Sequence, residues 1–319
     1  MRRVDYREYL EYARSRGVVR VEGVEIRLDP VRVERLHPTP EELTGIDTTV
    51  WSFPRRGSWA THRGDYRGNW PPQLARALIL MYTRPGDTVL DPMVGSGTTC
   101  VEAMLLGRNC VGVDISYDAV MLTLHRLYWL RRHLEELSGG WEGEVPLDEV
   151  LRARVEVYHG DARSLEEIGD DSIDLVATHP PYYNIIRYTR HRSPGDLSAS
   201  RRLEDYLRGI YTVALEAYRV LKPGGHMGIL VGDTRIRRHY VPITHHVLEV
   251  LLRAGFTLRE EVVKIQHRMK ATRERWARAK RDFLLIYHEK LYILRKPARG
   301  EGARYKYSRY LDLDEVLDG

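Results

Sequence analysis

Apolar residues between positions 71 and 83 recur with the spacing of an amphipathic helix. Leu74, Ala77, Leu78 and Met81 fall three or four residues apart, which places them on one helix face. Prolines at the start of this segment are compatible with the first turn of a helix. Further helices are predicted over residues 98–106, 118–137, 203–221 and 241–253.

Short apolar runs lie between these helices and are typical of buried strands. They occupy residues 88–90, 110–113, 155–158, 173–177 and 227–231, and two closing strands are expected over 256–265 and 289–294. Strands that alternate with helices of 10–15 residues indicate a doubly wound, mostly parallel sheet. The fold class is therefore α/β, with a seven-stranded sheet.

The chain before this regular pattern reads differently. Residues 4–16 have a charged, helix-like pattern, residues 18–26 have short β-like pieces, and prolines follow at positions 38 and 40. We interpret residues 1–60 as an N-terminal extension that packs on the main domain and contacts nucleic acid. The main domain is predicted over residues 61–297, and residues 298–319 form a C-terminal tail.

Composition narrows the class of protein. Among the 319 residues, no apolar run approaches the roughly 18 needed to span a bilayer, and the first residues lack the apolar core of a signal peptide. The two cysteines, Cys100 and Cys110, exclude a disulfide scaffold and a cysteine-built zinc site. We expect a cytoplasmic protein, with no membrane partner and no metal site.

A glycine-rich turn follows the first strand, in the segment Asp91 to Thr99. Gly95 and Gly97 allow a ligand to approach the backbone, and the helix that follows offers free N–H groups. The turn is not a P-loop because no lysine follows the glycines. Asp114 ends the second strand, 23 residues after Asp91, where a carboxylate can accept both ribose hydroxyls of an adenosine-type cofactor. Asp161 ends the third strand and is placed to take the adenine amine; the alternative is that both acids merely cap helices.

The fourth strand ends in Thr178-His179-Pro180-Pro181-Tyr182. Two successive prolines fix the backbone and leave carbonyl groups without local N–H partners. Such carbonyls can accept the hydrogens of an exocyclic amine while Tyr182 stacks on the planar base, with Tyr183 or Asn184 at the rim. Taken alone, the segment is better explained as a plain strand-to-loop turn with a core tyrosine.

The two motifs together resemble a known family. Residues 64–232 are similar to the S-adenosylmethionine-dependent amino-methyltransferases of DNA, which act on cytosine N-4 or adenine N-6. The resemblance implies a Rossmann-like methyltransferase fold and S-adenosyl-L-methionine as the cofactor. It implies catalysis by His179, Pro180, Pro181 and Tyr182. It implies cofactor binding by Trp70, Asp91, Pro92, Met93, Gly95, Ser96, Gly97, Thr98, Asp114, Asp161 and Ala162, with residues 64–81 around the methionine end.

Two positions depart from the family pattern. Met93 stands where phenylalanine is usual, which is a tolerable exchange where a side chain packs on the cofactor. His179 stands where aspartate, asparagine or serine is expected, so the usual hydrogen-bond acceptor is in question. A neutral imidazole with a pKa near 6.5 can accept a hydrogen bond or act as a mild base. The alternative is that His179 points into the fold and the Pro180 carbonyl does this work.

Positive charge clusters around the predicted site. The net charge is +5, and arginines number 43 against seven lysines, a usage that also suits heat adaptation. The basic segments span residues 54–67, 187–202 and 264–281, and three of them around one pocket favour a nucleic-acid groove. The residues expected to bind nucleic acid are Arg187, Arg190, Arg192, Lys264, Arg268, Lys270 and Arg273.

Three functions remain open at this point. The first is a methyltransferase for an exocyclic amine in DNA, cytosine N-4 before adenine N-6, acting on a flipped or unpaired base. The second is the same chemistry on cytosine in structured ribosomal or transfer RNA, favoured by the lack of a large insert for sequence recognition. The third is a nucleic-acid-binding protein without catalysis, which the histidine at position 179 would permit. The oligomeric state is not predicted.

Overall fold

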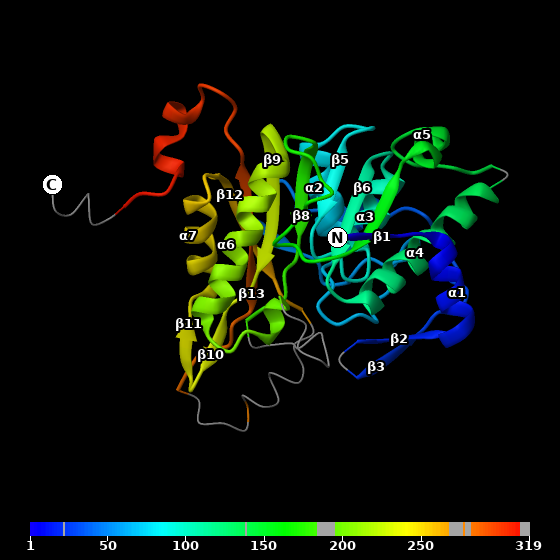
Figure 1. The fold of residues 1–319 in the computed structure, drawn as a ribbon, viewed down its shortest axis with the longest axis horizontal. Coiled ribbons are helices and arrows are strands. Elements are labelled where there is room, and N and C mark those ends of the chain that lie inside the picture. Colours follow the sequence, from blue (N-terminus) through cyan, green and yellow to red (C-terminus); the bar gives the residue numbers. More distant parts are fainter. Residues whose placement is uncertain (22, 138, 184–194, 268–276, 278–281, 313–319) are drawn as a thin grey trace.

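The architecture is a single large sheet with helices on both faces. The computed structural model describes residues 1–21, 23–137, 139–183, 195–267, 277 and 282–312. Nine strands form the sheet in the order β1-β7-β6-β5-β8-β9-β13-β12-β4. Figure 1 shows these strands side by side through the middle of the molecule, with the hairpin β2–β3 beside α1 at one edge and β10–β11 near α7.

The elements have the following bounds. The strands of the sheet are β1 (Arg2–Val4), β4 (Val50–Ser52), β5 (Thr88–Asp91), β6 (Asn109–Asp114), β7 (Val155–His159), β8 (Ile173–Thr178), β9 (Leu221–Val231), β12 (Thr257–Ile265) and β13 (His288–Arg295). The hairpins are β2 (Val18–Val21) with β3 (Val24–Arg27) and β10 (Thr234–Ile236) with β11 (His239–Val241). The α-helices are α1 (Tyr6–Arg16), α2 (Pro72–Tyr82), α3 (Thr98–Leu105), α4 (Tyr117–Glu135), α5 (Leu147–Arg152), α6 (Leu203–Val220) and α7 (Ile243–Arg253). Three short 3₁₀ helices are η1 (Pro40–Leu43), η2 (Leu197–Ala199) and η3 (Gly302–Ser308).

The seven predicted strands form the centre of the sheet, which confirms the predicted fold class. Five of them, from β7 to β9, are parallel, and β13 and β12 close the sheet in antiparallel pairings. The expected strand count is corrected from seven to nine. The N-terminal segment adds β1 antiparallel to β7 and β4 parallel to β12, so it extends the sheet at both edges. The predicted domain boundaries stay a prediction.

The sheet separates two apolar cores. Successive strand residues point to opposite faces, so Val89 and Leu291 pack on one side while Leu90 and Tyr292 pack on the other. Helices α1 to α5 cover the first face, and α6 and α7 cover the second. Within the described residues, no helix is both long and apolar enough to cross a membrane.

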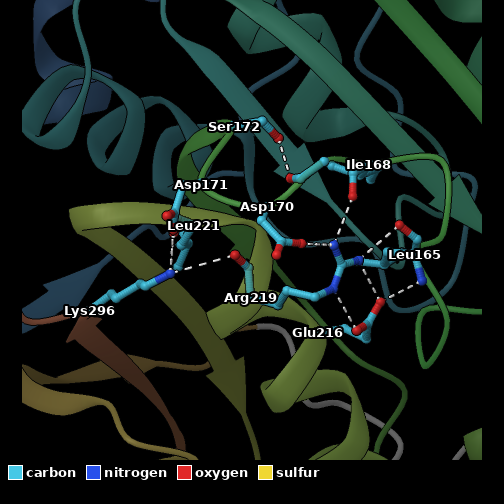
Figure 2. Close-up of polar contacts among 10 residues, drawn as sticks. Leu165, Ile168, Asp170, Asp171, Ser172, Glu216, Arg219, Leu221 and Lys296 are labelled. Atoms are coloured by element: carbon cyan, nitrogen blue, oxygen red, sulfur yellow. Dashed lines mark hydrogen bonds and ion pairs between the residues drawn. The ribbon is translucent and has the colours of Figure 1, made fainter.

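A polar cluster anchors the connection between β7 and β8, which carries Asp161 (Figure 2). The guanidinium of Arg219 on α6 donates to the carbonyl oxygens of Leu165 and Ile168, both at 3.0 Å, and pairs with Glu216 at 2.8 Å. Lys296 donates to Asp171 at 2.6 Å and to the Leu221 carbonyl at 2.7 Å. Because these bonds tie the connection to α6 and to the end of β13, they hold the loop after Asp161 in place.

Cys100 on α3 and Cys110 on β6 form a disulfide in the structure. Both are buried, and the bond ties the helix after the glycine-rich turn to the strand that ends at Asp114. The sequence reading excluded a disulfide scaffold and took cysteine usage as a sign of a reducing compartment. The pairing removes that support for a cytoplasmic location, because most cytosolic proteins keep their thiols reduced. The location stays a prediction.

Candidate active site

The ends of β5, β6, β7 and β8 meet around one pocket of about 770 Å³. Parallel strands bring their carboxyl ends to one edge of the sheet, and ligands bind there in folds of this kind. Ten of the eleven predicted cofactor residues line the pocket; they are Trp70, Asp91, Pro92, Met93, Gly95, Ser96, Thr98, Asp114, Asp161 and Ala162. The structure therefore brings together residues that are 92 positions apart in the chain.

Gly97 is the predicted cofactor residue that does not line this pocket. Its φ of +82° lies in the left-handed region, where it forms the N-cap of α3. A Cβ at this position would lie 3.0 Å from the Cγ2 atom of Thr123 on α4. Gly97 thus shapes the turn and allows α3 and α4 to approach each other.

Two carboxyl groups line the pocket, Asp91 buried and Asp114 partly buried. Asp114 accepts hydrogen bonds from the backbone N–H groups of Gly95, at 2.9 Å, and Ser116, at 2.8 Å. Asp91 accepts from Thr99 Oγ1 at 2.5 Å. Burial raises the pKa of Asp91 to about 7 and that of Asp114 to about 6, against the hydrogen bonds that favour the charged forms. Each oxygen of Asp114 accepts one of these bonds and keeps a lone pair for a hydroxyl donor.

Asp161 has a closer partner than the sequence suggested. The Arg163 guanidinium donates to its Oδ2 atom at 2.7 Å, and the Arg163 backbone N–H donates to Oδ1 at 2.9 Å. Gly195 covers the pair, since a Cβ there would lie 2.3 Å from both Asp161 Oδ2 and Arg163 Nη2. Asp161 lies at the pocket as predicted, and Arg163 shares it.

A second pocket, of about 1420 Å³, adjoins the first. Gly68, Asn69, Trp70 and His179 line both pockets. Tyr182 lines the second pocket, where Gly232 makes room for its ring: a Cβ on Gly232 would lie 2.9 Å from Tyr182 Cε2. Three of the four predicted catalytic residues therefore line the cavities: His179 both, Pro181 the first and Tyr182 the second. Pro180 is buried and its side chain lines neither cavity.

His179 points into the site. Its Nε2 atom lies 2.8 Å from the Tyr182 hydroxyl, and its ring is parallel to that of Trp70, with 6.1 Å between the centroids. Burial lowers the pKa of His179 to about 4, while the charge of Glu289 opposes this and Lys264 adds to it. The expected pKa near 6.5 for His179 is therefore wrong, because the sequence does not show how far folding removes the imidazole from water. His179 is neutral at pH 7.

Tyr183 was expected at the rim of the base pocket, and the structure places it elsewhere. It is buried, its hydroxyl donates to the Arg201 carbonyl at 3.1 Å, and its ring lies 5.9 Å from that of Tyr206. Asn184 lies outside the described residues.

Glu289 is a charged group of the site that the sequence did not indicate. Glu289 on β13 is buried, accepts a hydrogen bond from Tyr182 at 2.6 Å and pairs with Lys264 at 2.7 Å. The signal available in the sequence was a lone glutamate at the start of a predicted apolar strand. Its position opposite the catalytic segment depends on β13 pairing beside β9, which spacing does not predict.

The predicted nucleic-acid residues are only partly described. Arg187, Arg190, Arg192, Arg268, Lys270 and Arg273 lie outside the described residues. Lys264 is described, and its ammonium pairs with Glu289 inside the second pocket rather than at the surface. The structure adds a basic hairpin, β10–β11, with Arg235 on the wall of that pocket and Arg237 and Arg238 in its turn.

Comparison with known proteins identifies the family. The profile of the DNA methylase family matches residues 21–124 and 173–315, which is most of the chain. The chain belongs to the DNA methylase family. The amino-methyltransferase resemblance of the two motifs is thereby confirmed, and the matched segments include both the glycine-rich turn and the proline pair.

Individual relatives of this methylase match over shorter segments. DNA adenine methyltransferase YhdJ of Escherichia coli is 33% identical over 90 residues, which cover 28% of this chain and 31% of the relative. Type II methyltransferase M.SmaI of Serratia marcescens is 39% identical over 82 residues, 24% of this chain and 27% of the relative. The tRNA (guanine(10)-N2)-dimethyltransferase of Methanothermobacter thermautotrophicus is 33% identical over 118 residues, which cover 37% of this chain and 29% of the relative. Each match thus spans about a third of the relative's length or less.

The pocket of this methylase fits S-adenosylmethionine, the cofactor of the family. Asp114 lines the pocket with acceptor capacity on both carboxylate oxygens, which is compatible with the predicted contact to the ribose hydroxyls. Thr98, at the first turn of α3, lines the pocket with an Oγ1 atom that is buried and has no hydrogen-bond partner among the described residues. A buried polar atom at a helix N-terminus suits the carboxylate of the cofactor's methionine end.

Proposed function

We propose that this methylase transfers a methyl group to the exocyclic amine of a base in DNA, cytosine N-4 or adenine N-6. The observation that carries the proposal is the junction of two pockets at His179 and Trp70. One pocket fits the cofactor, and the other is large enough for a base and carries Tyr182 and Trp70 on its walls. In a duplex the target amine is inaccessible, so we infer that the base enters flipped or unpaired.

The residues of the junction have separate roles in this proposal. Bound S-adenosylmethionine supplies a methyl group on a sulfonium, whose carbon–sulfur bond breaks as the amine nitrogen bonds to that carbon and releases one proton. The Pro180 carbonyl and His179 accept hydrogen bonds from the amine and so localise its lone pair on nitrogen. Tyr182 and Trp70 present ring faces or edges to the base, and Arg237 at the tip of the β10–β11 hairpin is exposed to a phosphate backbone.

Structured RNA is the second candidate substrate. It is favoured by the matched tRNA (guanine(10)-N2)-dimethyltransferases, whose named target, guanine N2, is also an exocyclic amine. An RNA base in a loop is already unpaired, and shape can replace long sequence readout.

Methyl transfer from radiolabelled S-adenosylmethionine to genomic DNA and to total RNA tests the proposal. We expect label in DNA, and mass spectrometry of the digested nucleosides to give methylated cytosine or adenine. Label confined to RNA would transfer the proposal to the second candidate. Binding of both nucleic acids without label would support a protein that binds nucleic acid without catalysis.

A further inference from the structure

Four side chains form a continuous chain of polar contacts from the interior to the junction of the pockets. Lys264 Nζ pairs with Glu289 Oε2 at 2.7 Å, and the Tyr182 hydroxyl donates to Glu289 Oε1 at 2.6 Å. The Tyr182 oxygen in turn lies 2.8 Å from His179 Nε2. The members come from β12, β13 and the segment after β8, so only the folded sheet brings them together.

The direction of each hydrogen bond follows from the charge of Glu289. Burial opposes that charge, but Lys264 and the Tyr182 hydroxyl outweigh it and hold the pKa of Glu289 below its usual range. A carboxylate only accepts, so Tyr182 must use its one hydroxyl hydrogen toward Glu289. The Tyr182 oxygen is then an acceptor toward His179, and Nε2 must carry the hydrogen.

A neutral imidazole with its hydrogen on Nε2 has a lone pair on Nδ1. In the structure His179 Nδ1 is shielded from solvent and makes no close hydrogen bond to a described residue, although the backbone of Gly68 lies near the ring. A buried acceptor left without a close partner is destabilising, so its position at the junction of the two pockets indicates that a ligand supplies the donor.

We propose that Glu289 and Tyr182 are positioning residues that hold His179 as the Nε2–H tautomer, so that Nδ1 accepts the hydrogen bond of the target amine. The imidazole nitrogen then does the work of the oxygen that aspartate, asparagine or serine supplies at this position in related enzymes. This inference rests on the proposed function and explains how the His179 departure is compatible with it.

The groups that face His179 set the conditions for this role. Glu289 favours the protonated ring, Lys264 disfavours it, the backbone of Gly68 favours it, and the burial that outweighs them keeps the ring neutral above about pH 4. When the amine nitrogen gains its methyl group, the proton it releases passes to Nδ1 and then to water, since the ring does not retain a proton at pH 7. The Gly68 backbone is the competing partner, because a hydrogen on Nδ1 could be donated to it.

Nitrogen-15 NMR of the full chain, with labelled histidine, tests the tautomer without any substrate. The His179 signals are identified by their loss in His179→Asn. We expect a protonated Nε2 and an unprotonated Nδ1 in the wild type, and a loss of this preference in Tyr182→Phe and Glu289→Gln. A hydrogen on Nδ1 in the wild type, or an unchanged tautomer in both variants, would overturn the proposal.

Matched controls separate this effect from general damage. Tyr158 donates to Glu156 at 2.9 Å on the surface of β7, so Tyr158→Phe and Glu156→Gln remove the same groups far from the site. His62 is an internal reference, since its Nε2 atom lies 2.6 Å from Glu102 and it should keep its tautomer in every site variant.

Turnover supplies the second readout. We expect Tyr182→Phe and Glu289→Gln to lower kcat by about 10- to 100-fold, with cofactor affinity unchanged. In a His179→Asn background, where an amide oxygen is the acceptor, Glu289→Gln should lose most of that effect. Equal losses in both backgrounds would contradict the proposal. If the wild type methylates no nucleic acid while its tautomer responds as expected, the proposed function fails and the positioning of His179 stands.

Discussion

Two buried glutamates, Glu102 and Glu289, have similar hydrogen-bond and ion-pair partners but different roles. Glu102 on α3 accepts hydrogen bonds from Trp59 Nε1 at 2.7 Å, His62 Nε2 at 2.6 Å and Arg76 Nη1 at 2.7 Å. These donors come from the N-terminal segment and α2, so the carboxylate joins three separate parts of the chain.

Glu289 also combines a cation with a histidine, but its network is not closed within the protein. Lys264 forms an ion pair with Glu289, and the Tyr182 hydroxyl connects Glu289 to His179 by hydrogen bonds. His179 lines both pockets. The residue types in a buried ion pair therefore do not decide its role. The role depends on whether the last member of the network faces packed protein or a cavity.

Removal of the closed network should have the largest effect on stability. Glu102→Ala leaves the buried Trp59 and His62 donors without their acceptor and leaves Arg76 with Glu144 as its remaining counter-charge, and we expect a loss of about 3–5 kcal/mol in the free energy of unfolding. Guanidinium unfolding measures it. Glu289→Gln keeps an acceptor for Tyr182 but leaves the Lys264 ammonium without its counter-charge; because Lys264 borders the second pocket rather than packed protein, we expect a smaller loss. Equal stability losses in the two variants would break the comparison.

The disulfide stabilises the same helix as the Glu102 network, because Cys100 and Glu102 both lie on α3. Cys100 and Cys110 are ten residues apart, and closing a loop of that length stabilises a fold by about 2–3 kcal/mol. We expect a reductant to lower the unfolding midpoint accordingly. Two free thiols found on titration of the unfolded, unreduced protein would contradict the pairing.

Cofactor affinity should depend on pH through Asp114. Its pKa is raised to about 6, so the carboxylate that accepts ribose hydroxyls is lost as the pH falls through that value. We expect S-adenosylmethionine to bind more weakly at pH 5 than at pH 8, by up to about tenfold per unit below the pKa. Calorimetric titration across this range measures it. Asp114→Asn should bind weakly at every pH; a wild-type affinity that is flat with pH would exclude this role.

The smallest effect is expected at a third glutamate. Glu156 pairs with Arg3 at 3.1 Å and accepts from Tyr158, as Glu289 does from a cation and a tyrosine, but both charged side chains are solvent-exposed. Water screens such a pair, so Glu156→Gln should change the free energy of unfolding by less than about 1 kcal/mol. A loss as large as that of Glu102→Ala would mean that burial does not distinguish stabilising glutamates from those that contribute little.

The centre of the fold could be predicted because its signals are local. Each central strand is a short apolar run between helices, and each polar strand end falls at a turn, so Asp91, Asp114 and His179 could be placed at one edge of a parallel sheet. The added edge strands β1 and β4 have three residues each and depend on partners more than 150 residues away. No periodicity is detectable in so short a run.

Local signals in the sequence are sufficient to predict the central strands, the polar strand ends and the family, because glycine conformations, proline pairs and hydrophobic periods act within a few residues. Only the tertiary structure decided what His179 can do. Its ring is stacked on Trp70 and removed from water, and Tyr182 connects it to Glu289. Glu289 is about 110 residues away in the chain and reaches the site because β13 pairs with β9. The pKa and tautomer of a side chain depend on such neighbours, which chain order does not reveal.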